Sequence, residues 1–260
     1  MMTADNGTPA PRLLCLPYAG GSGVAYRHWS SAFPRNEVVA FDYPGHLMRP
    51  GERLARTMDA LVGRIEESVS AHWDRPFVLV GSSLGALVAY ELASRAEQRG
   101  TPPAALVVLA CPGPGRLWKH PPIAGLDDER FSAAFGTRYG GPAAGLLGDP
   151  DHRELLLPIV RADMELFEEY AGGRHEAVGC DVIAVTGTED AAAPGEDVDA
   201  WHDHTSGAVH VLNVPGGHFV VEEPGRFAGA LSSLLDGRPA APLLGPAATP
   251  SPSPDPRTPR

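Results

Sequence analysis

One stretch, residues 76–93, constrains the fold more than any other part of the chain. It reads PFVLVGSSLGALVAYELA, so an apolar run ends at the GSSLG of residues 81–85 and a helical pattern follows at once. A G-x-S-x-G turn between a strand and a helix is so sharp that only glycine fits two residues before and two after its central serine. Ser83 has that spacing, whereas Ser82 has a valine and a leucine at the same distance. We therefore predict a tight turn that presents the Ser83 hydroxyl; the alternative is a glycine- and serine-rich turn without chemistry.

Short β-rich apolar runs alternate with longer helical patterns along most of the chain, which favours an α/β fold with a mostly parallel sheet flanked by helices. The expected strands are residues 12–17, 37–43, 76–81, 105–111, 181–186 and 208–214. The expected helices are residues 26–33, 58–73, 84–98, 198–204 and 224–235. A chain of 260 residues with this pattern is expected to form one domain, over residues 1–237.

The alternation is interrupted once, and we predict a helical lid over about residues 113–179. Two helical pieces, residues 127–135 and 151–170, are expected there, joined by a Gly/Pro-rich stretch at 136–150. The second piece carries apolar residues that could line a tunnel or equally well pack a core: Leu155, Ile159, Val160, Leu166 and Phe167. The tail at 238–260 is dominated by Pro, Ala, Ser and Thr, and we expect it to be disordered.

The net charge of −11 argues against a protein that neutralises phosphates with Lys and Arg, so nucleic acid is not an expected partner. The same charge would repel an acidic carrier protein unless a local basic patch exists. The N-terminus lacks the apolar core of a signal peptide, and no run of about 18 apolar residues is present for a membrane span. We expect a cytoplasmic protein without a membrane partner.

The chain contains no clear motif for binding a cofactor or a metal. Cys15, Cys111 and Cys180 are odd in number and far apart, which indicates buried reduced thiols rather than disulfides or metal ligands. His202 and His204 lack a third ligand and are expected to be solvated. We therefore predict that the protein uses no cofactor and no metal.

A serine hydroxyl needs an imidazole to take its proton, and in this kind of fold the partners follow in the order Ser, Asp or Glu, His. His218 is the best candidate for the base because it lies in a Gly-rich loop after the last strand and before the closing helix. Asp190 is the expected acid because it ends the turn after the strand at 181–186. Glu189 is its local competitor, and two more distant carboxylates, Asp197 and Asp199, are also possible.

Acyl transfer builds negative charge on a carbonyl oxygen, which backbone N–H groups can stabilise. One donor should be Leu84, directly after Ser83, and we assign the other to Ala19 in the loop after the first strand. The alternative is that the glycines of this loop form an ordinary turn, or a weak phosphate-loop lookalike that lacks the Lys-Ser/Thr pair.

Five segments carry a family resemblance: LPYAGGS at 16–22, YPGH at 43–46, the motif and helix at 81–93, RADMEL at 161–166 and PGGHF at 215–219. Together they resemble the stand-alone type II thioesterases of polyketide and nonribosomal peptide biosynthesis. The resemblance implies an α/β-hydrolase fold, with Ser83 as nucleophile, Asp190 as acid, His218 as base and Ala19 as an oxyanion donor. It also implies an editing hydrolase that frees acyl or aminoacyl groups from the phosphopantetheine arm of an acyl or peptidyl carrier protein.

The chain departs from the family pattern at four positions. Tyr18 and Ser82 stand where the family usually has histidine, and His46 and Leu47 stand where it has an arginine-glycine pair. Two other functions stay open on the residues alone. The same triad would serve a carboxylesterase or product-releasing hydrolase, and a non-catalytic binding protein could keep the fold.

Overall fold

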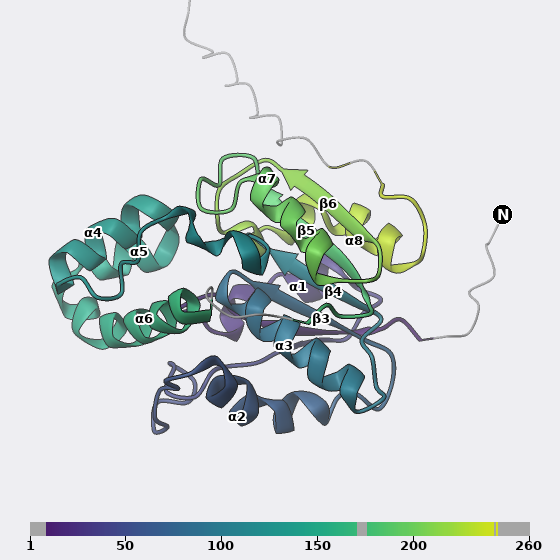
Figure 1. Ribbon diagram of the computed structural model, residues 1–260, viewed down its shortest axis with the longest axis horizontal. Coiled ribbons are helices and arrows are strands. Elements are labelled where there is room, and N and C mark those ends of the chain that lie inside the picture. The colour runs from purple at the N-terminus through teal and green to yellow at the C-terminus, as the bar shows by residue number, and fades with distance from the viewer. Residues whose placement is uncertain (1–8, 171–175, 242, 244–260) are drawn as a thin grey trace, which may run out of the picture.

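The centre of the computed structural model is a sheet of six parallel strands in the order β2-β1-β3-β4-β5-β6, formed within residues 9–170, 176–241 and 243, which the structure describes (Figure 1). The strands are β1 Arg12–Leu16, β2 Val38–Ala40, β3 Phe77–Ser82, β4 Ala105–Leu109, β5 Asp181–Gly187 and β6 Val209–Val214. The predicted α/β class and all six predicted strand positions are confirmed. Since the strands are parallel, their carboxyl ends lie at one edge, where the connecting loops can assemble a site.

Helices cover both faces of the sheet, because alternate strand residues point to opposite sides. The helices α2 (Met58–Ser70) and α3 (Leu84–Gln98) pack on the face that includes Leu14 and Leu16. On the opposite face, α1 (Trp29–Ala32) and α8 (Ala228–Leu235) pack with Leu13 and Cys15. The central strands β3 and β4 are buried along their full length, which is why they read as continuous apolar runs.

Several predicted helices are shorter or tighter than expected. The predicted helix at 26–33 is a 3₁₀ turn, Gly23–Tyr26, followed by the four-residue α1. The segment at 198–204 is the 3₁₀ helix Asp199–His204 after the short α7 (Gly195–Val198), and Pro224–Arg226 is a separate 3₁₀ turn before α8. Further 3₁₀ turns are Pro114–Lys119 and Val220–Glu222. In a 3₁₀ turn, as in an α-helix, residues three apart lie on the same face, so the apolar pattern alone did not distinguish the two kinds of helix.

Three α-helices between β4 and β5 project from one end of the sheet (Figure 1), and this helical insertion, the predicted lid, keeps that name below. They are α4 (Asp128–Tyr139), α5 (Gly141–Gly148) and α6 (Pro150–Tyr170). The predicted Gly/Pro-rich connector at 136–150 is wrong, since α4 continues to Tyr139 and α5 fills most of the rest. Only Gly140 separates α4 from α5. Its φ of 63°, and the φ of 72° at Gly141, the first residue of α5, suit glycine and end one helix before the next begins.

Parts of the predicted lid and tail lie outside the described residues, namely 171–175, 242 and 244–260. Within the described part, Cys15, Cys111 and Cys180 are buried free thiols. No helix there is long and apolar enough to cross a bilayer. The prediction of solvated imidazoles is right for His202, which is exposed, and wrong for His204, which is partly buried against Trp201.

Candidate active site

Ser83 occupies a strained turn between β3 and α3. Its φ of 52° and ψ of −117° place it in a conformation that residues with side chains rarely adopt. A Cβ atom on Gly81 would lie 2.0 Å from the Gly85 carbonyl oxygen, and one on Gly85 would lie 2.2 Å from the Leu16 oxygen. Both glycines of the motif are therefore required by backbone contact, and the turn holds Ser83 at the carboxyl end of β3.

Asp190 and His218 form a buried pair beside this turn. The imidazole Nδ1 of His218 donates to Asp190 Oδ2 across 2.8 Å. The other carboxylate oxygen, Oδ1, accepts from the amides of Ala192 and Ala193 at 2.9 and 3.2 Å. These three hydrogen bonds fix the carboxylate, and with the proton on Nδ1 the Nε2 atom of His218 is the ring nitrogen that can accept another.

The competing carboxylates are placed differently. Glu189 and Asp199 are exposed, and neither is hydrogen-bonded to His218. Asp197 is buried and lines the same pocket as Ser83, but the carboxylate that meets the imidazole is that of Asp190.

Ser83 and His218 line two adjoining hollows beneath the lid, which share these two residues and together form the pocket described below. Tyr139, the last residue of α4, stands over the imidazole with a ring-centroid distance of 4.9 Å. Burial raises the pKa of the Tyr139 phenol to about 12, so this residue lines the pocket as an uncharged side chain. Among the described residues no hydrogen bond joins Ser83 to His218; such bonds are often long in ligand-free enzymes and tighten around a substrate.

The predicted tunnel residues separate into different environments. Phe167 lines the pocket with Ser83, whereas Leu155 is 70% exposed on the outside of the lid. Val160 faces a second groove, and Leu166 is in the core. Sequence reasoning missed Met164, which lines the pocket one helical turn before Phe167. Their spacing of three residues on α6 was the available signal.

Ala19 and Leu84, the two predicted oxyanion donors, both lie beside Ser83. Ala19 lines the pocket with Ser83 and His218, and Leu84 begins α3 directly after Ser83. Among the described residues, neither amide donates to an acceptor in the turns and loops. The amide of Gly20, the next residue in the loop, donates to Asp163 Oδ2 across 2.7 Å and so is not available to an oxyanion.

The structure shows what surrounds each of the four residues that depart from the family pattern. The Tyr18 hydroxyl donates to Glu222 Oε1 at 3.1 Å. Burial is the largest of the causes that raise the pKa of Tyr18 above the usual 10. Ser82 is buried in β3. His46 is buried 2.8 Å from Asp163 Oδ2, whereas Leu47 is exposed.

A parallel sheet with helices on both faces, a serine at a strand-to-helix elbow and a histidine after the last strand define the α/β-hydrolase fold. The thioesterase domain family matches residues 11–235, and the chain belongs to this family. The resemblance to type II thioesterases of polyketide and nonribosomal peptide biosynthesis is thereby confirmed by the family match and by the relatives below.

One curated relative is a probable cadicidin biosynthesis thioesterase of Streptomyces griseus, 34% identical over 82% of this chain. The chain spans 59% of that relative's length. Among solved structures, the type II thioesterase BorB of the borrelidin biosynthetic cluster is 30% identical, with a TM-score of 0.76 over 90% of this chain and 95% of its own. RedJ, a thioesterase of the prodiginine pathway of Streptomyces coelicolor, is 30% identical with a TM-score of 0.75 over 91% and 90%.

Proposed function

We propose that the protein hydrolyses acyl or aminoacyl thioesters held on the phosphopantetheine arm of carrier proteins, and so removes groups that block an assembly line. The observation that carries the proposal is the buried Asp190–His218 pair, joined across 2.8 Å at the pocket that Ser83 lines. Family membership supports thioesters as the substrate class, and relatives from biosynthetic clusters support a carrier-bound arm.

In the proposed first half-reaction, Ser83 Oγ attacks the thioester carbonyl while Nε2 of His218 takes the hydroxyl proton. The tetrahedral oxyanion accepts hydrogen bonds from the amides of Ala19 and Leu84, each worth about 3 kcal/mol in the transition state. When the carbon–sulfur bond breaks, the imidazolium returns the proton to the leaving thiolate. The products are a free pantetheine thiol and an acyl ester on Ser83.

In the second half-reaction, water replaces the thiol. His218 takes a proton from the water as it attacks the acyl ester, and the same donors stabilise the second oxyanion. Collapse returns the proton to Ser83 Oγ and releases a carboxylic acid. Asp190 stays ionised throughout, orienting the ring and stabilising the imidazolium.

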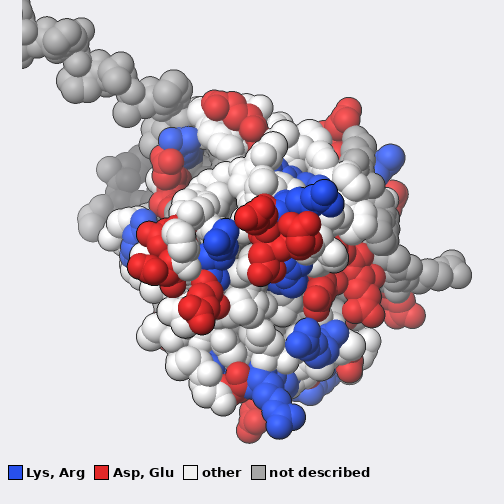
Figure 2. Space-filling model, turned by 90° about the vertical axis from the view of Figure 1, so that its left-hand side faces the viewer, with Lys and Arg blue, Asp and Glu red and all other residues white. Residues whose placement is uncertain are grey.

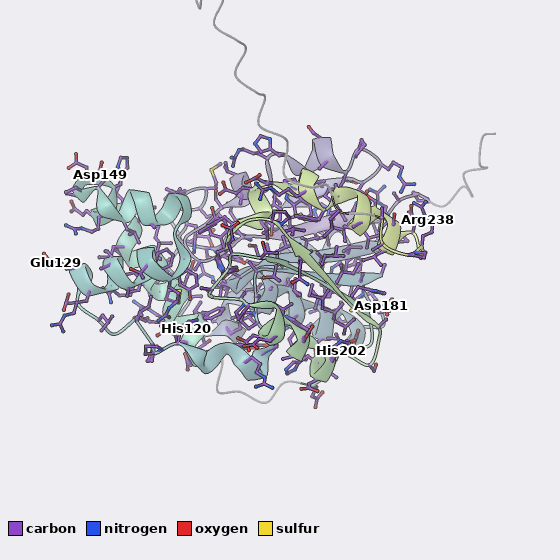
Figure 3. All side chains as sticks on the ribbon, turned by 90° about the horizontal axis from the view of Figure 1, so that it is seen from above. His120, Glu129, Asp149, Asp181, His202 and Arg238 are labelled. Atoms are coloured by element: carbon purple, nitrogen blue, oxygen red, sulfur yellow. The ribbon has the colours of Figure 1, made fainter. Side chains whose placement is uncertain are left out.

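Charge around the pocket supports an anionic arm as the occupant. Two arginines, Arg116 and Arg138, line the pocket with His120, although the whole chain carries a net charge of −11. Two carboxylates, Glu168 and Asp197, also line it. Figure 2 shows basic and acidic side chains interspersed over the lid end, so this face is not uniformly negative. Figure 3 places His120 where the lid joins the body, whereas Glu129 and Asp149 lie at the far end of the lid. The two guanidinium groups therefore line the pocket that a phosphodiester-bearing arm would enter.

The first experiment compares release of an acetyl group from a phosphopantetheinyl carrier protein with cleavage of a simple soluble ester. Wild type, Ser83→Ala and the matched control Ser82→Ala are measured side by side. Carrier hydrolysis that disappears only in Ser83→Ala supports the proposal. Ester cleavage without carrier hydrolysis points instead to a carboxylesterase, and activity that survives Ser83→Ala contradicts the assigned nucleophile.

The carrier assignment has a separate test in Arg138→Glu. The control is Arg130→Glu, because Arg130 lies on the same helix α4, has a largely exposed side chain and does not line the pocket. We expect Arg138→Glu to raise KM for the carrier-bound substrate about tenfold, on the scale of electrostatic focusing in clefts. KM for a small thioester without a phosphate should not change. Equal effects on both substrates would contradict recognition of the anionic arm.

A further inference from the structure

A buried carboxylate in the lid contacts the loop that carries one proposed oxyanion donor. Asp163, on α6, is 2% exposed. Its Oδ2 atom accepts from the amide of Gly20 at 2.7 Å and lies 2.8 Å from Nε2 of His46. A buried carboxylate is costly unless it is paired and hydrogen-bonded, so these two contacts account for its presence there. The residues come from three separate segments: the loop after β1, the loop after β2 and the lid.

The loop after β1 is a tight turn around Ala19. The amide of Gly21 donates to the Tyr18 carbonyl at 2.8 Å, which closes a four-residue turn. Gly20 stands at the third position with a φ of +71°, as a type II turn requires. In a trans peptide the N–H and C=O groups point in opposite directions, so the bond to the Tyr18 carbonyl also directs the Ala19 N–H away from the turn.

The lid helix touches this turn twice, one helical turn apart. A Cβ atom on Gly20 would lie 2.4 Å from Cγ2 of Val160, so α6 packs directly on the glycine. Asp163, three residues after Val160, accepts the hydrogen bond from the Gly20 N–H. The peptide after Ala19 is thus fixed by the lid, and the peptide before it is fixed by the turn's own hydrogen bond.

We propose that Asp163 and His46 are positioning residues for acyl transfer: Asp163 holds the Gly20 peptide so that the Ala19 amide faces the oxyanion, and His46 holds Asp163. This inference rests on the proposed function for its catalytic consequence. A one-ångström error in donor placement weakens transition-state stabilisation strongly, because the donor must meet the oxyanion rather than the ground-state carbonyl.

The surroundings of His46 fit the holding role. Its Nε2 faces the Asp163 carboxylate and its Nδ1 lies 3.3 Å from the Pro44 carbonyl oxygen, so both ring nitrogens face acceptors. An imidazolium satisfies both as a donor. Burial alone would lower the pKa of His46, but the hydrogen bond and charge of Asp163 outweigh it and raise that pKa above 6.5. The other titratable groups facing the ring are Asp42 and Tyr43.

The test compares Asp163→Ala with Arg161→Ala in the full chain. Arg161 is a matched control on the same helix: it binds the carbonyl oxygens of Ala124 and Leu126 and the carboxylate of Asp128, but not the loop of Gly20. The substrate is a small acyl thioester without a carrier, which removes docking effects. We expect Asp163→Ala to lower kcat about 10²-fold with little change in KM, as expected for a displaced oxyanion donor, and Arg161→Ala to leave kcat unchanged.

Two further readouts separate positioning from simple loosening of the lid. The affinity for a boronic acid that forms a tetrahedral adduct on Ser83 should fall in Asp163→Ala by the same factor as kcat. Amide exchange at Gly20 should accelerate in Asp163→Ala and not in Arg161→Ala. Equal losses of kcat in both variants, or unchanged exchange at Gly20, would overturn the inference. Wild-type protein without Ser83-dependent hydrolysis would overturn the proposed function instead, while exchange at Gly20 would still decide the Asp163 contact.

Discussion

Two buried carboxylate–imidazole pairs lie on either side of the Ser83 turn, and each has a nitrogen–oxygen distance of 2.8 Å. In the Asp190–His218 pair, Nδ1 faces the carboxylate, and among the described residues no hydrogen bond involves Nε2. In the Asp163–His46 pair, both ring nitrogens of His46 face acceptors. The first imidazole has a ring nitrogen placed to take a proton from a neighbour, whereas both nitrogens of the second are placed to donate. The partner of the second ring nitrogen therefore separates an imidazole that can act as a base from one held between two acceptors.

The pairs also differ in what they connect. Asp190 and His218 lie on loops at the carboxyl ends of β5 and β6, within the body that carries the sheet. Asp163 and His46 join the lid to that body. Removing a charge from the first pair should impair the chemistry itself, while removing one from the second should act through the geometry of the loop of Ala19.

The largest expected effect is that of Asp190→Asn. The amide can donate to Nδ1 of His218 and would then place the proton on Nε2, the nitrogen that must accept from Ser83. We expect kcat to fall about 10⁴-fold without unfolding, the scale seen when a triad aspartate becomes asparagine. Steady-state kinetics and circular dichroism measure both quantities. A loss of less than about tenfold would show that Asp190 is not the acid and would make Asp197 the next candidate.

Asp163→Asn should have a smaller effect. The amide oxygen can still accept from the Gly20 N–H, but it loses the charge that pairs with His46. We expect kcat to fall about tenfold, the cost of weakening one charge-assisted hydrogen bond by roughly 1.4 kcal/mol. The measurement is kcat on the same thioester as for Asp190→Asn. A loss as large as that of Asp190→Asn would remove the distinction between the two pairs.

The smallest effect is a pH dependence of stability that involves His46. Because Asp163 raises the folded-state pKa of His46 above 6.5, protonation stabilises the folded protein. This stabilisation is fully present below pH 6.5 and is lost as the pH rises through the folded-state pKa. Urea unfolding of wild type and His46→Gln across pH 5.5 to 9 should therefore show a difference in the free energy of unfolding that decreases with pH. A difference that grows with pH would mean that His46 is buried neutral.

The sequence was sufficient where a local pattern determines the structure. The GSSLG turn predicts Ser83 at the elbow because backbone contact excludes side chains at Gly81 and Gly85. Alternation of strands and helices predicts the parallel sheet, and the order of the chain then brings Asp190 and His218 to the same edge as Ser83.

The sequence was insufficient where contacts join distant segments. His46 and Asp163 are 117 residues apart, and no spacing rule relates a loop to a lid helix. Both lie in segments that carry the family resemblance, at 43–46 and 161–166, but the resemblance does not say that they touch. The helix α5 was missed because glycine and proline usually mark a connector, whereas here packing against α4 and α6 outweighs their low helix propensity.

The central claim is that Ser83 carries an acyl group between the two half-reactions, and rapid-quench mass spectrometry tests it most directly. Wild-type protein is mixed with an acetylated carrier protein, quenched in acid within milliseconds and digested. The account predicts an acetyl mass on the peptide that contains Ser83, which forms and decays during turnover and is absent in His218→Ala. Hydrolysis that proceeds with no acyl peptide, under conditions where deacylation is slowed by low pH, or an acetyl group on another residue, would contradict it.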